Sequence, residues 1–98
     1  MAGEVVLISV FEVPAADAEA FVAEWDRASD YLQSQAGYVE RTLHQAVASD
    51  AEFQFVNVAR WQTAEDFRVA TQTPEFREAT AGLAGYQSHP ALYRVVRG

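Results

Sequence analysis

Four stretches of the chain carry the apolar residues and the period-two spacing that are typical of β-strands. They cover residues 4–13, 38–47, 53–61 and 88–97. The first and third stretches are apolar on both faces, because valines and isoleucines occupy positions on each side of the extended chain. A sheet built from such strands needs to be covered on both of its faces.

Helical spacing separates these strands. From about residue 15 to residue 35, one stripe collects most of the apolar side chains: Ala18, Phe21, Val22, Trp25, Ala28, Ser29 and Leu32. Thr63 is expected to begin a second helix, with Asp66 in the capping-box position. Thr73 followed by Pro74 predicts a further start, so this helical region is expected to break in two.

The resulting order, β-α-β-β-α-α-β, predicts one α+β domain over residues 1–98 with a ferredoxin-like split βαβ fold. Its helices can cover only one face of the antiparallel sheet. The other face keeps an apolar patch larger than soluble monomers usually show: Val6, Ile8, Val10, Val56 and Val58. A second copy packed sheet to sheet would cover this patch, so the pattern predicts a homodimer.

Charge and composition narrow the choice of partners. The chain of 98 residues has 14 acidic and 7 basic residues, for a net charge of −7. An acidic chain without a basic cluster is a poor partner for nucleic acid or anionic membranes. It has no cysteine, which excludes disulfides and thiolate metal sites. No basic region precedes the short apolar opening, so we expect a cytoplasmic protein without a signal peptide or membrane span.

The segment FVNVARW places an asparagine within the most apolar part of the chain. Extended geometry puts Phe55, Asn57, Ala59 and Trp61 on the same face of this strand. A buried carboxamide without partners costs roughly 1–3 kcal/mol, so Asn57 needs either protein groups or a ligand. If this face meets the helices, Asn57 and Trp61 line an aromatic-walled cavity of the kind that binds small molecules.

Other side chains are expected to complete this cavity as substrate-binding residues: Ser9, Phe21, Trp25, Phe55 and Tyr86. The alternative is structural, with Asn57 bonded to a neighbouring loop and Trp61 part of the core. The pattern alone favours neither interpretation. The two histidines are 45 positions apart and lack a metal-spaced motif, so no metal site is expected. His44 is a possible general base, but a surface role is the favoured interpretation, and its face is not settled by the pattern.

The segment FVNVARWQTAEDFRVATQTPEF resembles the antibiotic biosynthesis monooxygenase family of dimeric α+β barrels, and the similarity extends over essentially the whole chain. In the anthrone oxygenases of this family, a strand Asn and a Trp four residues later line the active site. Asn57 and Trp61 match that pair in type and spacing. The resemblance implies an enzyme without metal, haem or flavin, in which the deprotonated substrate itself reduces dioxygen. It also implies that Asn57 hydrogen-bonds the substrate oxygen and that Trp61 stacks on or orients its rings.

The haem-degrading branch of the same family is the natural rival. Its functional Asn, Trp and His would fall at Ser9, Ala70 and Thr80, and a threonine cannot replace the axial imidazole. We therefore expect a cofactor-independent monooxygenase that oxidises an aromatic or polyketide-type small molecule with O2. Two alternatives stay open at this point: a non-catalytic dimer that binds a small molecule, and a lyase or cyclase on the same fold.

Overall fold

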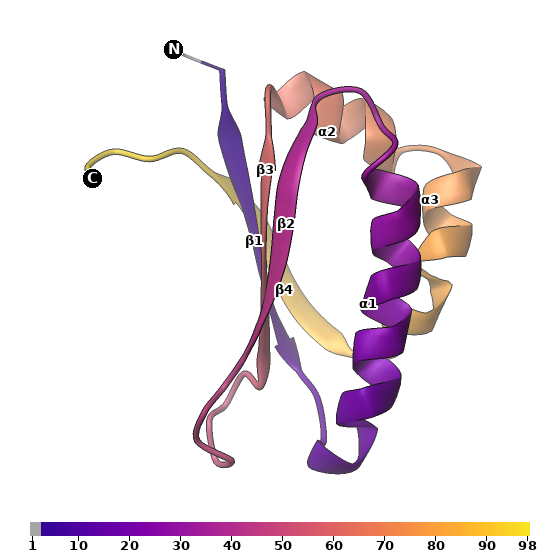
Figure 1. Ribbon diagram of the computed structural model, residues 1–98, viewed down its shortest axis with the longest axis vertical. Coiled ribbons are helices and arrows are strands. Elements are labelled where there is room, and N and C mark those ends of the chain that lie inside the picture. The colour runs from indigo at the N-terminus through magenta and orange to yellow at the C-terminus, as the bar shows by residue number, and fades with distance from the viewer. Residues whose placement is uncertain (1–2) are drawn as a thin grey trace.

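The computed structural model describes residues 3–98 and has the expected order of elements (Figure 1). The strands are β1 (Val5–Glu12), β2 (Tyr38–Gln45), β3 (Phe55–Trp61) and β4 (Gln87–Tyr93). The helices are α1 (Ala18–Leu32), α2 (Ala64–Thr71) and α3 (Pro74–Ala79), with short 3-10 turns at Ala15–Asp17 and Ala81–Leu83. The predicted α+β class and ferredoxin-like order are confirmed.

The four strands form one antiparallel sheet in the order β2-β3-β1-β4, and the helices lie on one face of it (Figure 1). Backbone pairing aligns Asn57 with Leu43 on one side and with Ser9 on the other. Ser9 is paired in turn with Pro90. These four residues therefore form one row across the sheet, facing the helices.

Buried and half-buried side chains alternate along β3 as the sequence predicts. Phe55, Asn57, Ala59 and Trp61 are buried. Val56, Val58 and Arg60 are only half-buried, because no helix lies over the opposite face. The face of β3 that carries Asn57 thus meets the helices, as the sequence predicts.

The hydrophobic core consists of two clusters separated by polar side chains. One cluster contains Phe11, Val13, Phe21 and Phe55, and the other contains Leu32, Ala59, Trp61 and Ala70. Two polar residues, Ser9 and Asn57, are also buried, and they lie along β1 and β3 between these two groups. Two polar side chains in the middle of a small core are costly unless their hydrogen bonds are satisfied.

The helical region after β3 breaks where the sequence predicts. The hydroxyl oxygens of Thr63 and Thr73 accept hydrogen bonds from the backbone N–H groups of Asp66 and Phe76, each at 3.0 Å. Each threonine is therefore the N-cap of its own helix. In the described part of the chain, none of these helices combines the length and apolar character that crossing a membrane requires.

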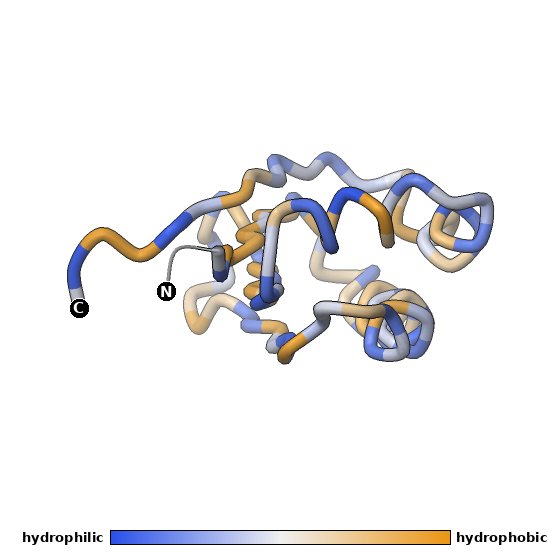
Figure 2. Tube along the Cα trace, turned by 90° about the horizontal axis from the view of Figure 1, so that it is seen from above, coloured by the Kyte–Doolittle hydropathy of each residue, from blue (hydrophilic) through white to orange (hydrophobic). Residues whose placement is uncertain are grey.

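The last strand is shorter than expected. The pattern predicts extended pairing over residues 88–97, but β4 ends at Tyr93. Tyr93 pairs with Val6, and β1 begins only one residue earlier, so residues beyond Tyr93 have almost no partner strand left. Figure 2 shows the C-terminal segment leaving the body of the protein, with an apolar stretch near its end. Val95 and Val96 in this segment are 71% and 79% exposed.

Candidate functional site

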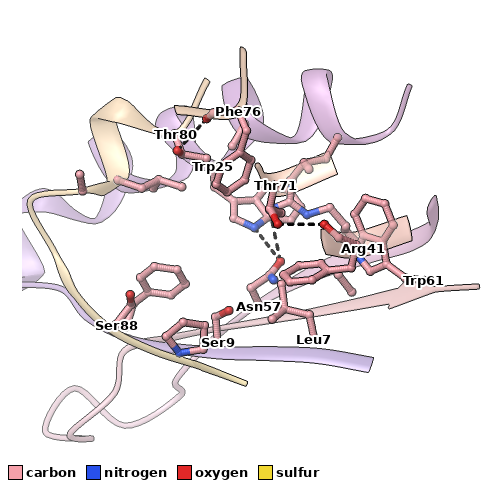
Figure 3. A pocket seen from close by; sticks show the side chains of 18 residues that line it. Leu7, Ser9, Trp25, Arg41, Asn57, Trp61, Thr71, Phe76, Thr80 and Ser88 are labelled. Atoms are coloured by element: carbon pink, nitrogen blue, oxygen red, sulfur yellow. Dashed lines mark hydrogen bonds between the residues drawn. The ribbon is translucent and has the colours of Figure 1, made fainter. Parts of the chain in front are cut away.

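A cavity of about 360 Å³ lies between the sheet and the helices (Figure 3). This volume falls within the range of small-molecule sites. Its wall is largely apolar: Leu7, Phe11, Trp25, Ala28, Leu32, Ala59, Trp61, Phe67, Phe76, Leu83, Ala84 and Pro90. Six polar side chains complete the lining: Ser9, Arg41, Asn57, Thr71, Thr80 and Ser88. The structure thus brings Asn57, Trp61, Ser9 and Trp25 together around one space.

The orientation of the Asn57 carboxamide is determined by its neighbours. The indole Nε1 of Trp25 donates a hydrogen bond to Asn57 Oδ1 at 2.9 Å, and Nη2 of Arg41 approaches the same oxygen at 3.5 Å. Indole and guanidinium groups can only donate, so the oxygen of the amide must face them. No hydrogen bond joins the amino nitrogen, Nδ2, to another group within residues 3–98. Asn57 therefore keeps a free donor while its acceptor is used.

Arg41 is a charged residue of the cavity lining that the sequence pattern did not single out. Its side chain comes from β2, and its guanidinium carbon lies 4.6 Å from the centre of the Trp25 ring. Its direct neighbour on β3 is Ala59, whose small side chain leaves room on this face. Arg41 Nε and Nη1 are buried without a hydrogen-bond partner. Within residues 3–98 it forms no ion pair with a carboxylate.

Burial affects the charge of Arg41 only modestly. Desolvation lowers the pKa of its guanidinium to about 10, although the nearby Tyr38 acts in the opposite direction. A group with that pKa is still protonated at neutral pH. The cavity consequently contains a largely buried cation, held next to Trp25 and Asn57.

An irregularity in β2 explains how Arg41 comes to face the cavity. Tyr38 pairs with Trp61 and Glu40 with Arg60, so Val39 is an extra residue in β2, as in a β-bulge. Tyr38 packs edge-on against Trp61 at 5.8 Å, and Leu43 also lies on the helix side. A regular strand could turn only one of these two residues inward. The bulge turns both inward, and Arg41 shares the face of Leu43.

The same irregularity places His44 away from the cavity. His44 pairs with Val56 on the uncovered face of the sheet, where its ring lies 3.1 Å from the Thr42 hydroxyl. The side chain is exposed. Its assignment as a general base for this cavity is therefore not supported within one chain. No histidine, aspartate or glutamate from residues 3–98 lines the cavity. The same residues contain no group of three or more side chains that could hold a metal ion.

Three of the residues expected to bind substrate lie outside the lining of the cavity. Phe21 stacks on Phe55 with ring centres 4.7 Å apart, and Tyr86 packs edge-on against Phe21 at 5.3 Å. These rings belong to the first core cluster, where Phe11 also contacts Phe21. The prediction that they line this cavity is wrong, because the three aromatic rings pack against one another in the core beside it.

Trp61 forms one side wall of the cavity. It is 1% exposed and is held between Tyr38 and Phe67, with the Phe67 ring centre at 5.7 Å. Its indole Nε1 is buried and has no hydrogen-bond partner. A buried indole N–H usually finds an acceptor, so this donor, like Nε and Nη1 of Arg41, is left unsatisfied within residues 3–98.

The two threonines in the lining come from the helices and present acceptors. Thr71 donates its hydroxyl proton to the carbonyl of Phe67 at 2.8 Å, and Thr80 donates to that of Phe76 at 2.8 Å. Their hydroxyl oxygens keep lone pairs for other contacts. The sequence pattern predicts no cavity role for Thr71 or Thr80, because which helix face lines the cavity depends on tertiary packing.

Solved structures with the same fold include two with substantial sequence identity. A candidate monooxygenase from Shewanella loihica is 40% identical, with a TM-score of 0.87 over 100% of this chain and 99% of that one. SnoaB, a cofactor-independent oxygenase from Streptomyces nogalater, is 28% identical, with a TM-score of 0.87 over 99% and 97% of the two chains. A dimeric protein of unknown function from Bacteroides fragilis shares the ferredoxin-like fold at 14% identity, with a TM-score of 0.75 over 95% and 97%.

No curated protein matches this sequence. The family model described as antibiotic biosynthesis monooxygenase matches residues 4–82, which is most of the chain. That match includes β1, β2 and β3, from which Ser9, Arg41, Asn57 and Trp61 project toward the cavity. On this evidence, the chain belongs to the antibiotic biosynthesis monooxygenase family.

Proposed function

We propose that this protein is a cofactor-independent monooxygenase that oxidises an aromatic or polyketide-type small molecule with O2. The observation that carries the proposal is the oriented Asn57 amide in an aromatic-walled cavity, with its oxygen occupied by Trp25 and its amino group free. Similarity to SnoaB, which is described as a cofactor-independent oxygenase, supports the same chemistry. Membership of a monooxygenase family is consistent with it.

The proposed reaction converts a methylene group flanked by aromatic rings into a carbonyl group. Loss of one proton from the methylene carbon gives an enolate, in which the negative charge lies largely on the carbonyl oxygen across the ring. The electron-rich carbon then transfers electrons to O2 and forms a C–O bond, giving a hydroperoxide. Cleavage of the O–O bond with loss of the second C–H proton leaves the ketone, so that one oxygen atom is retained and the other leaves as water.

In this scheme Asn57 and Trp61 have different roles. The Nδ2 group of Asn57 donates a hydrogen bond to the substrate oxygen as negative charge develops on it, which lowers the barrier to enolate formation. The buried ring of Trp61 forms a flat apolar wall for the substrate rings. Ser9 and Trp25 complete the walls around Asn57.

The direct test is oxygen uptake with 9-anthrone as the probe, after treatment of the protein with a metal chelator. We expect one O2 consumed per anthrone and a product that has gained one oxygen atom and lost two hydrogens. The uncatalysed oxidation of anthrone is measured separately and subtracted. Binding of anthrone without oxygen uptake would instead indicate a small-molecule-binding protein, and a product that has lost water without oxygen uptake would indicate a lyase or cyclase.

We also propose that the functional unit is a homodimer. Val6, Ile8, Val10, Val56 and Val58 are only half-buried in a single chain and lie on the face without helices. The apolar C-terminal segment is also left in solvent, with Val95 and Val96 largely exposed. Burial of these surfaces against a second copy would remove them from water, at a gain of roughly 25 cal/mol per Å² of apolar area.

A further inference from the structure

The cavity carries a single formal charge, and that charge is positive. Arg41 is its only ionisable lining residue among residues 3–98, and no carboxylate accompanies it. The protein as a whole is acidic, with a net charge of −7. An isolated cation in the interior of an acidic protein is unusual, because many carboxylates are available to pair with basic side chains.

The contacts of Arg41 only partly compensate for its burial. The ring of Trp25 offers a cation–π contact at 4.6 Å, and Asn57 Oδ1 offers one long contact at 3.5 Å. Nε and Nη1 are buried and have no hydrogen-bond acceptor among residues 3–98. A buried, incompletely paired charge is costly, and the ligand that relieves this cost best is an oxyanion.

We propose that Arg41 is the residue that ionises the substrate, and that the substrate class is an acidic phenol or enol on an aromatic ring system. This inference rests on the proposed function and adds to it the source of the negative charge. The ligand enters as the neutral acid, since the negative protein repels free anions. Within the cavity its O–H bond breaks, the electron pair stays on oxygen beside the guanidinium, and the proton passes to water. For the enol tautomer of the ketone, this gives the same enolate as loss of the methylene proton. No histidine or carboxylate is then needed as the base.

The experiment measures the acidity of a bound phenol that cannot be oxidised further. 2-Hydroxy-9,10-anthraquinone is a suitable probe, because its phenolate absorbs at longer wavelength than the phenol. Its pKa is titrated free in solution and bound to the protein. We expect binding to the wild-type protein to lower that pKa by roughly 1–3 units, the effect of an opposite charge within a few Å.

Three variants assign this shift to Arg41. Arg41→Met removes the charge but keeps a long side chain, and the bound pKa should then equal or exceed the free value, because desolvation alone raises it. Arg41→Lys should retain part of the shift. Arg77→Met is the matched control, since Arg77 is exposed on α3 and is absent from the cavity lining, and it should leave the wild-type shift unchanged. Circular dichroism and thermal melting establish that each variant is folded.

The outcomes separate this inference from the proposed function. A wild-type protein that leaves the pKa of the probe unchanged, raises it, or fails to bind the probe overturns the role of Arg41, even if anthrone is oxidised. The same holds if folded Arg41→Met keeps the full shift. Absence of oxygen uptake with a normal, Arg41-dependent shift overturns the monooxygenase proposal alone, because the probe does not react with O2.

Discussion

At the scale of single residues, Asn57 links three parts of the protein. Its oxygen accepts from Trp25 on α1 and is close to Arg41 on β2, while its own backbone belongs to β3. Replacement by alanine would therefore remove the donor to the substrate and also leave the indole N–H unpaired. Both catalysis and stability would fall, the latter by about 1–3 kcal/mol, so this substitution does not separate the two roles.

The substitution Asn57→Asp separates the catalytic role of this residue from its contribution to stability. One carboxylate oxygen can still accept from Trp25 and gains an ionic contact with Arg41, so the free energy of unfolding should be maintained. The second oxygen replaces a donor by an acceptor and repels an enolate. Turnover should fall by roughly 10²-fold, as it does when an oxyanion donor is lost. Thermal melting and initial rates of oxygen uptake measure the two effects; a stable variant with wild-type rates would contradict the assignment of Asn57.

Arg41 is a charged residue in a cavity whose other lining residues are neutral. The uncharged lining residues would suit any flat apolar ligand, which says little about reactivity. A buried guanidinium that stays protonated at neutral pH adds a preference for negative charge. For a reaction in which the substrate must become an anion before it meets O2, that preference favours the reactive form over the resting one.

At the scale of elements, the break between α2 and α3 shapes the roof of the cavity. Phe67 and Thr71 come from α2, whereas Phe76 comes from α3 and Thr80 follows it. Thr73 organises the junction. Its hydroxyl oxygen accepts from Phe76 N–H and lies 2.7 Å from the Tyr31 hydroxyl, which itself donates to the carbonyl of Ala70 at 2.8 Å. The proton between the two hydroxyls therefore belongs to Thr73.

This network predicts that alanine substitution of the two N-cap residues lowers the free energy of unfolding by unequal amounts. Thr63→Ala removes a single capping bond on the surface and should cost about 1 kcal/mol. Thr73→Ala removes a cap and also the bond that links α3 to Tyr31 on α1, so it should cost about 2 kcal/mol. Urea unfolding measures both. Thr73→Ser should restore most of the loss, and equal effects at the two caps would show that the link to Tyr31 contributes nothing.

At the scale of the whole molecule, the proposed homodimer can be tested at its centre. Val58 lies opposite Ile8 on the face without helices, in the two middle strands of the sheet. Val58→Asp would place an unpaired charge between the two sheets and should weaken association by roughly 10²- to 10³-fold. Light scattering at micromolar concentration should find a dimer for the wild type and a monomer for the variant.

A matched control uses the helix side of the protein. Val69 on α2 is 56% exposed, so Val69→Asp adds the same charge outside the proposed interface. This variant should remain a dimer. A wild-type protein that is monomeric under these conditions would contradict the dimer, since the valine face would then be stable in water.

Local signals in the sequence were sufficient for the elements and for part of the site. The order of strands and helices, the paired starts at Thr63 and Thr73, and the inward face of β3 all match the structure. These features depend on contacts within a few residues, namely capping bonds, proline geometry and the alternation of side chains along one strand. For the same reason, Asn57 and Trp61 could be assigned to one face before any tertiary contact was considered.

What only the tertiary structure decided was the pairing of β2 with β3. The alternation in residues 38–47 groups Tyr38 with His44 and separates both from Arg41, and a regular strand would keep that grouping. The extra residue at Val39 reverses it, so that Tyr38 and Arg41 face the helices and His44 faces outward. Such a bulge is stabilised by packing of Tyr38 on Trp61 and burial of Leu43, contacts between strands that no local pattern records. Because a shift of one residue moves every side chain to the other face, the charge of the cavity was determined by this long-range pairing.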